Sequence, residues 1–321
     1  MSNKFLSTTS AFLLSTSILV ADIPKVTVDI APVHSLVSKV MNGVGKPDLI
    51  IPAGASPHEY QLKPSNAKSL QNADIVFWIG EDLTPWLEKG LSSLAQDASI
   101  TSLLDLSGLE LLSFREGALF EAHDHGEDHD DHDDHDKKKH DDHDDHDDHA
   151  HGEHDPHAWL SPQIAKIWLN VIAAKLSEVD PDNAAKYFSN AKSARDNVDS
   201  LVSEVNSILD PIRDKKFVVF HDAYQYFERD FGISASGAIS LGDASDPSPA
   251  RLSEIRRRVV DEAVQCVLAE PQYDPGLVKS VVEGTDAKTT VIDPLGVSLE
   301  TGPNLYENLI RNLATNLAKC F

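Results

Sequence analysis

Basic and aromatic side chains are scarce in this chain. It has 28 Lys plus Arg against 52 Asp plus Glu, a formal net charge of −24, and 7% of its 321 residues are aromatic. A strongly acidic chain with no basic stripe repels nucleic-acid phosphates and anionic lipid, so we expect neither as a partner. With 41% hydrophobic residues the chain can bury a full core, and its length predicts about two domains.

Long apolar runs are missing as well. The apolar stretch from Ala11 to Val20 is too short to span a bilayer as a stable helix. Lys4 precedes it and the small residue Ala21 follows it, which is typical of an export signal cleaved near Ala21. We therefore predict a signal peptide over residues 1–21 and a soluble exported protein. The alternative is an N-terminal arm without a targeting role.

Cysteine is rare too, with only Cys266 and Cys320 present. Cys266 lies in an apolar run that predicts a buried strand. In an oxidising compartment the two could form a disulfide. Closing a loop of roughly fifty residues stabilises a fold by about 4 kcal/mol in the chain-entropy model. Export favours this bridge over the alternative of two buried thiols.

Histidine and acid are abundant, and they gather in one segment. Residues 121–157 hold 17 acidic residues and three lysines, a net charge of −14, so the remainder carries −24 + 14 = −10. Eleven of the 15 histidines lie between His123 and His154. They are His123, His125, His129, His132, His135, His140, His143, His146, His149, His151 and His154. So polar a segment cannot form a packed core. We interpret residues 122–154 as a disordered loop that binds metal ions weakly, multiply and reversibly. The alternative is a solvated acidic spacer.

Outside this segment, apolar strand patterns alternate with helical ones. Such alternation predicts an α/β fold with mostly parallel sheets covered by helices. The expected strands cover residues 25–30, 48–51, 73–79, 216–220, 236–239, 265–269 and 289–292, with one or two more around Leu103 and Leu111. A helical pattern of nearly thirty residues follows Pro181. We therefore expect an N-terminal lobe over 22–180, a long rigid linking helix over 181–210 and a C-terminal lobe over 211–321.

Only four histidines lie outside the loop, and three occupy special positions. His58 follows the second strand, His157 precedes a helix, and His221 ends the strand 216–220. Asp293 ends another strand. Ligands of open α/β sheets bind beyond the carboxyl ends of the strands, so these four side chains are expected to meet in a crevice between the lobes. Three imidazoles and one oxygen suit Zn²⁺. We expect His34, in the first helix, not to be a ligand.

Several motifs make the chain similar to a known family. They are residues 54–60 (GASPHEY), 63–65 (KPS), 70–74 (LQNAD), 155–162 (DPHAWLSP), 220–227 (FHDAYQYF) and 293–296 (DPLG). In this order they resemble the periplasmic zinc-binding proteins of ABC transporters. The resemblance covers the whole exported chain. It implies two α/β lobes, a rigid connecting helix and a metal in the cleft between the lobes.

The resemblance also implies a ligand set. His58, His157 and His221 match the three histidine ligands of the family, and histidine rather than glutamate at position 221 points to zinc instead of manganese. Asp293 matches the aspartate of the manganese receptors. Other zinc receptors use water or a glutamate just before the first histidine, where this chain has Pro57; Glu59 stands on the other side. The fourth ligand therefore remains open between Asp293, Glu59 and water.

Two further features agree with the zinc members of this family. The acidic histidine-rich loop is typical of them, and Cys266 and Cys320 match a disulfide found in them. The resemblance implies a monomeric periplasmic receptor that captures Zn²⁺ and delivers it to an ABC permease in the membrane, without enzymatic activity.

Three alternatives remain. One is a manganese-type receptor of the same family, and another is a secreted zinc buffer or adhesin without a transport partner. The third is a zinc hydrolase or hydratase, because three histidines with an open position can activate water. Against this last reading, the sequence contains no H-E-x-x-H motif and no nucleophile elbow, and Glu59 and Glu270 are the only plausible bases.

Overall fold

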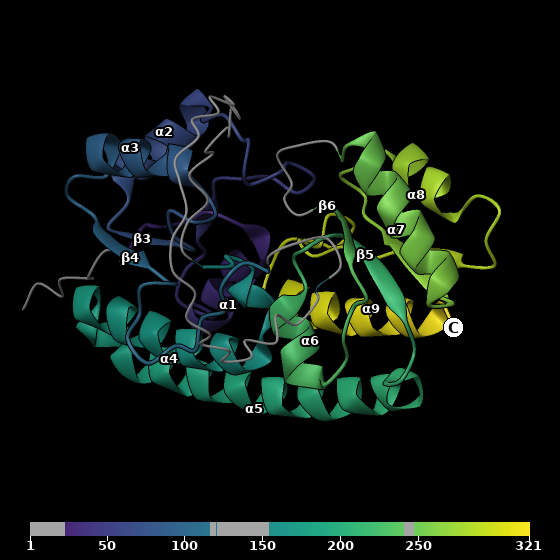
Figure 1. The fold of residues 1–321 in the computed structure, drawn as a ribbon. Coiled ribbons are helices and arrows are strands. Elements are labelled where there is room, and N and C mark those ends of the chain that lie inside the picture. The colour runs from purple at the N-terminus through teal and green to yellow at the C-terminus, as the bar shows by residue number, and fades with distance from the viewer. Residues whose placement is uncertain (1–22, 116–119, 121–153, 241–246) are drawn as a thin grey trace, which may run out of the picture.

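Two parallel four-stranded sheets lie side by side above a layer of long helices (Figure 1). The computed structural model describes residues 23–115, 120, 154–240 and 247–321. The predicted signal peptide over 1–21 lies outside these residues. So does the predicted metal-binding loop, apart from His154 at its end.

The first sheet has the strand order β2-β1-β3-β4, and all of its pairs are parallel. Its strands are β1 (Val26–Val28), β2 (Asp48–Leu49), β3 (Ile75–Trp78) and β4 (Ser99–Ser102). The helices α1 (Ala31–Val40), α2 (Pro64–Asn72) and α3 (Pro85–Leu94) connect them. β1 and β3 are buried at every position, as expected for central strands of a sheet covered on both faces.

The second sheet repeats this topology, with the order β6-β5-β7-β8 and parallel pairing throughout. Its strands are β5 (Phe217–His221), β6 (Ala238–Ser240), β7 (Cys266–Ala269) and β8 (Lys288–Val291). The helices α6 (Gln225–Phe231), α7 (Pro249–Asp261) and α8 (Pro275–Val282) belong to this half. Because both sheets are parallel, each gathers the carboxyl ends of its strands at one edge.

Three helices tie the halves together. α4 (Pro162–Val179) packs against α5 (Ala184–Leu209), whose 26 residues span about 39 Å. The last helix, α9 (Leu305–Lys319), runs beside α5 and also packs on α1 (Figure 1). There the Tyr306 backbone N–H donates to the Ser35 hydroxyl at 3.0 Å. The largest buried apolar cluster consequently runs through both halves, while a smaller one lies between the second sheet and α7 and α8.

The predicted disulfide is confirmed. Cys266, the first residue of β7, is bonded to Cys320, just after α9, with a Cα–Cα distance of 5.8 Å. The bridge attaches the last helix to the centre of the second sheet. Within the described ranges, no helix is both long and apolar enough to cross a membrane.

One predicted element is absent. The possible strand around Leu111 does not form, because the backbone there pairs with α6 and with the segment before α4. The Leu112 N–H donates to the Tyr226 hydroxyl at 3.0 Å, and its carbonyl accepts from the Asp155 N–H at 2.8 Å. One tyrosine hydroxyl and one backbone N–H thus replace the neighbouring strand that a ladder requires.

Candidate metal-binding site

Three imidazoles from distant parts of the chain meet between the two sheets. The ring centres of His58 and His157 are 5.9 Å apart, and those of His157 and His221 are 5.3 Å apart. All three line one small cavity of about 20 Å³, which is above the minimum volume that a bound water molecule needs. The sequence-predicted histidines therefore converge, although 163 residues separate the first from the last.

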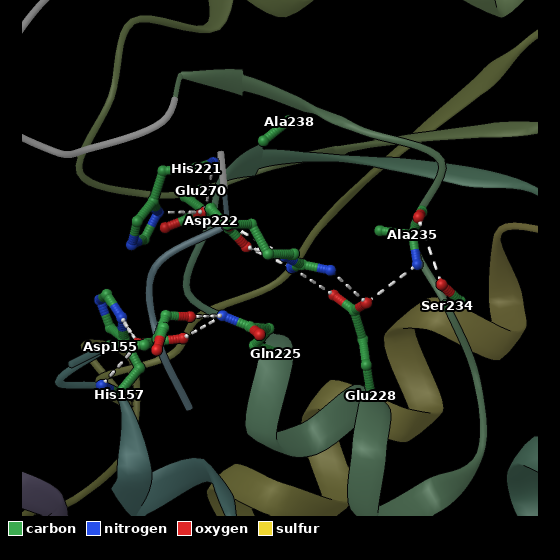
Figure 2. Close-up of polar contacts among 12 residues, drawn as sticks. Asp155, His157, His221, Asp222, Gln225, Glu228, Ser234, Ala235, Ala238 and Glu270 are labelled. Carbon is green, nitrogen blue, oxygen red and sulfur yellow. Dashed lines mark hydrogen bonds and ion pairs between the residues drawn. The ribbon is translucent and has the colours of Figure 1, made fainter. Parts of the chain in front are cut away.

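His221 is held by a carboxylate from the neighbouring strand. It is the last residue of β5, and Glu270 directly follows the adjacent parallel strand β7. Glu270 Oε1 lies 2.7 Å from His221 Nδ1, and both side chains are buried (Figure 2). An Nδ1–H donated to this carboxylate fixes the tautomer, which leaves the ring's lone pair on Nε2.

His157 has a carboxylate partner of the same kind, placed two residues before it. Asp155 Oδ1 lies 2.7 Å from His157 Nδ1 and also accepts the His157 backbone N–H at 2.9 Å. Gln225 and Tyr226 of α6 hold Asp155 in turn, by donating to its Oδ2 at 3.1 Å and to its carbonyl at 2.9 Å (Figure 2 draws the Gln225 contact). His157 Nε2 is buried and has no hydrogen-bond partner among the described residues.

His58 comes from the loop after β2, on the side of the first sheet. The Trp86 indole N–H donates to the Pro57 carbonyl at 2.7 Å, and the His58 backbone N–H donates to the Ser56 hydroxyl at 3.3 Å. The Trp86 ring also contacts Tyr60, with ring centres 5.8 Å apart. The loop is thereby fastened to α3.

The spacing of the three rings approaches that of a coordinated ion. A tetrahedral zinc with Zn–N bonds of about 2.0–2.1 Å places imidazole centres roughly 5 Å apart. The rings of His157 and His221 are at this spacing, and the ring of His58 is slightly farther from that of His157. Across the part of the chain that the structure describes, no group of three or more His, Cys, Asp or Glu side chains already has the geometry of a bound ion.

Asp293 lies close to this cavity without lining it. Its Oδ1 accepts the backbone N–H groups of Leu295 and Gly296 at 3.1 and 2.8 Å, and its neighbours Pro294 and Leu295 line the cavity instead. Glu59 is exposed. The fourth ligand therefore stays a prediction.

The remaining histidines have other surroundings. His34 Nε2 lies 3.1 Å from the Pro47 carbonyl, and its Nδ1 lies 3.4 Å from the Ser38 hydroxyl. Burial lowers the pKa of His34, and it does not line the cavity. His154 is half-buried. The other ten histidines of the predicted loop lie outside the described residues.

The charge around the site is negative and buried. Asp155 and Glu270 lie directly behind two of the imidazoles. Next to His221, Asp222 contacts the Arg115 guanidinium, which also bonds Glu228 at 2.9 Å. Burial raises the pKa of Asp222 while Arg115 opposes this rise. Buried carboxylates beside three nitrogen donors favour a dication over a neutral or anionic ligand.

Sequence reasoning missed the two carboxylates that orient the imidazoles. Glu270 was considered only as a possible base, and Asp155 only as part of a motif. The signal for Glu270 was available, because it ends a strand next to the one that His221 ends. Both carboxylates bond imidazole nitrogens at 2.7 Å, so their role here is to orient rings.

Comparison with known proteins adds independent findings. The family model described as periplasmic zinc-uptake complex component A matches residues 26–320. The high-affinity zinc uptake system protein ZnuA of Brucella abortus is 48% identical over 303 residues, which cover 92% of this chain and 91% of that protein. ZnuA of Paracoccus denitrificans is 44% identical, with coverage of 94% and 92%.

Solved structures share the fold at lower identity. A crystal structure of ZnuA has a TM-score of 0.73 and 21% identity, and covers 93% of this chain and 99% of its own. The protein FpvC of Pseudomonas aeruginosa, solved in complex with Mn²⁺, also has a TM-score of 0.73, with 18% identity and coverage of 93% and 98%.

Proposed function

Since the chain belongs to the family of periplasmic component A proteins of zinc-uptake complexes, we propose that it binds one Zn²⁺ tightly through His58, His157 and His221. It is a periplasmic solute-binding protein that captures Zn²⁺ and delivers it to a membrane ABC permease, which is the role of this family. The convergence of the three imidazoles on one cavity is the observation that carries the ligand assignment.

The donor set supports zinc as the cargo. Three neutral imidazoles form a borderline set that suits Zn²⁺, whereas Mn²⁺ prefers more oxygen ligands. The carboxylates of Asp155 and Glu270 bond the rings' Nδ1 atoms and increase the basicity of the opposite nitrogens. A manganese-type receptor remains the alternative, and its best support is the predicted oxygen ligand Asp293.

The predicted domain boundaries are part of the same proposal. We assign residues 22–180 to an N-terminal lobe and 211–321 to a C-terminal lobe, with 181–210 as the linking helix. The two separate sheets and the position of α5 support this division. Residues 1–21 serve as the export signal, and residues 122–154 collect zinc weakly and reversibly.

We also propose that the protein has no catalytic activity, acts as a monomer and does not bind nucleic acid. The family consists of receptors rather than enzymes. The net charge of −24 opposes binding to nucleic acid. The large buried cluster that runs through both halves already closes the core within one chain.

Calorimetry on single variants tests the ligand assignment. His58→Ala and His221→Ala should each abolish the tight zinc event and leave the circular dichroism spectrum unchanged, because each removes a nitrogen donor from a cavity wall. His34→Ala is the matched histidine control and should retain the event. A tight event of unchanged affinity in both cavity variants would refute the assignment.

A further inference from the structure

Gln272 is the one polar side chain of the cavity wall whose role is unexplained. It lies in the loop after β7 and lines the same cavity as the three imidazoles. Both its amide nitrogen and its amide oxygen are buried, and neither has a hydrogen-bond partner among the described residues. Buried amides are almost always hydrogen-bonded, so an unpartnered one beside a ligand cavity indicates a missing partner.

The loop that carries Gln272 is fixed on both sides. Glu270, two residues earlier, bonds His221 Nδ1 at 2.7 Å. Tyr273, the next residue, stacks on Phe220 with ring centres 4.3 Å apart and an interplanar angle of 18°. The Tyr273 ring also contacts the His221 ring, at 5.5 Å. The neighbouring residues therefore fix the position of Gln272 beside His221. Its amide lines the cavity because the loop holds it there.

Ser56, Trp159 and Glu270 already have hydrogen-bond partners in the cavity wall, although Glu270 Oε2 has none among the described residues. Ser56 accepts the His58 N–H, and the Trp159 indole donates to the Pro294 carbonyl at 2.8 Å. Glu270 is on the Nδ1 side of His221, opposite the nitrogen that faces a metal. Asp293 does not line the cavity. Three imidazoles leave one position of a tetrahedral ion to be filled, and the hydrogen-bonded atoms of Ser56, Trp159 and Glu270 are not available to fill it.

We propose that a water molecule takes this fourth position and that the Gln272 amide holds it. This inference rests on the proposed zinc site and specifies how its coordination is completed. An amide can both donate to and accept from a water molecule, so the bound water satisfies the buried side chain. Because glutamine is neutral, it orients the water without adding a charged ligand. Gln272 is therefore a positioning residue for the bound ion. The water ligand leaves the site together with the ion.

Substitution at position 272 tests this role in the full exported chain loaded with Co²⁺ or Zn²⁺. Co²⁺ is a spectroscopic substitute for Zn²⁺, and its visible absorption changes with pH when a bound water ionises. Gln272→Leu should weaken Zn²⁺ binding about tenfold in a chelator competition, as loss of an outer hydrogen-bond partner does. Gln272→Glu should raise the midpoint of the Co²⁺ spectral titration, because a negative charge beside the water disfavours its ionisation.

The controls separate this inference from the proposed site. Gln71→Leu makes the same change on the exposed face of α2 and should leave both readouts unchanged. Thermal unfolding of each metal-free variant shows whether it has folded. Wild-type affinity and wild-type spectra in both Gln272 variants would overturn the inference while leaving the zinc site intact. Loss of tight binding in Asp293→Asn, with normal binding in Gln272→Leu, would assign the position to the carboxylate. Failure of the wild-type chain to bind one Co²⁺ or Zn²⁺ would instead overturn the site itself.

Discussion

At the scale of single residues, the orientation of two imidazoles depends on two buried carboxylates. Glu270 and Asp155 belong to different segments, yet each is 2.7 Å from a histidine Nδ1. Each therefore selects the tautomer that presents Nε2 to the cavity. We therefore expect these partners to contribute to the affinity of the site in addition to the nitrogen donors.

Neutralising Glu270 should weaken zinc binding. Glu270→Gln keeps an acceptor for His221 but removes the charge, so we expect the affinity for Zn²⁺ to fall about tenfold. For Glu270→Leu the fall in affinity should approach about a hundredfold. Chelator competition measures both losses. Asp274→Asn provides a control nearby in the chain, since Asp274 only caps α8. Equal affinities for Glu270→Leu and the wild type would show that the carboxylate does not orient the ring.

A third buried carboxyl group, that of Asp29, predicts that the stability of the fold depends on pH. Asp29 accepts the backbone N–H groups of Ile30 and Ile79 at 2.7 and 2.6 Å, and burial raises its pKa to about 7. Its pKa in the unfolded chain is about 3.9. The folded state therefore holds more protons between these values, and this group's contribution to stability falls as pH rises from about 4 to 7.

The comparison with Asp29→Asn isolates that contribution. The variant cannot ionise at this position, so the wild type should lose stability relative to it as pH rises through this window. Urea unfolding at pH 4.5, 6 and 8 measures the difference. A difference in unfolding free energy that is constant across the three pH values would contradict the raised pKa.

At the scale of elements, the disulfide between β7 and the end of α9 should contribute strongly to stability. Its two cysteines are 54 residues apart, and a loop of that length corresponds to about 4 kcal/mol in the chain-entropy model. The double variant Cys266→Ser/Cys320→Ser should lose stability of this order in denaturant unfolding. The wild type should show no thiol in denaturant without reductant. Two titratable thiols there would rule out the bridge in the isolated protein.

The histidine-rich segment leads to a separate prediction. Deletion of residues 122–154 should remove several weak zinc equivalents and keep the tight one, because His58, His157 and His221 all lie outside the deleted segment. Calorimetry of the deleted and full chains gives both stoichiometries. If the tight event disappeared with the segment, its ligands would have to be sought there.

Local signals in the sequence identified most elements of the fold. A capping residue followed by proline marks the starts of three helices. At each of them the residue before Pro162, Pro249 or Pro275 accepts a backbone N–H through its side chain. Strand ends likewise placed His221 near a ligand cavity. The strand expected around Leu111 is wrong, because the backbone there bonds the Tyr226 side chain and the Asp155 N–H. Such isolated contacts leave no periodic pattern in the sequence.

The candidate site was also predictable only in part, because some of its contacts leave no pattern in the sequence. Histidines outside the repeat could be recognised by their position after strands. The turn that engages the Asp293 carboxylate and the buried amide of Gln272 depend on local packing. Neither is visible from residue type and spacing alone.

At the scale of the whole molecule, α5 and α9 restrict how far the two halves can separate. Arg311 of α9 forms a two-pronged ion pair with Glu204 of α5 at 2.8 and 2.9 Å, and Glu307 pairs with Lys39 of α1 at 2.6 Å. α9 therefore contacts elements of both halves. We expect zinc exchange to involve local movement near His58 more than rotation of one half against the other.

Small-angle scattering tests this expectation together with the monomeric state. A compact chain of this length has a radius of gyration of roughly 20 Å, and the value should change little between zinc-free and zinc-loaded protein. The forward scattering should correspond to one chain. A clear contraction on adding zinc would indicate hinge closure, and a doubled mass would contradict a monomer.

The return of α9 to α1 also determines when the molecule can finish folding. Ser35 and Tyr306, which bond each other, are 271 residues apart, so the shared core stays open until nearly all of the chain has been synthesised. Contacts between such distant residues form slowly, because the intervening loop must close first. A nascent chain that cannot complete its core stays unfolded. An unfolded chain can pass through a narrow translocation pore and form the native state on the far side.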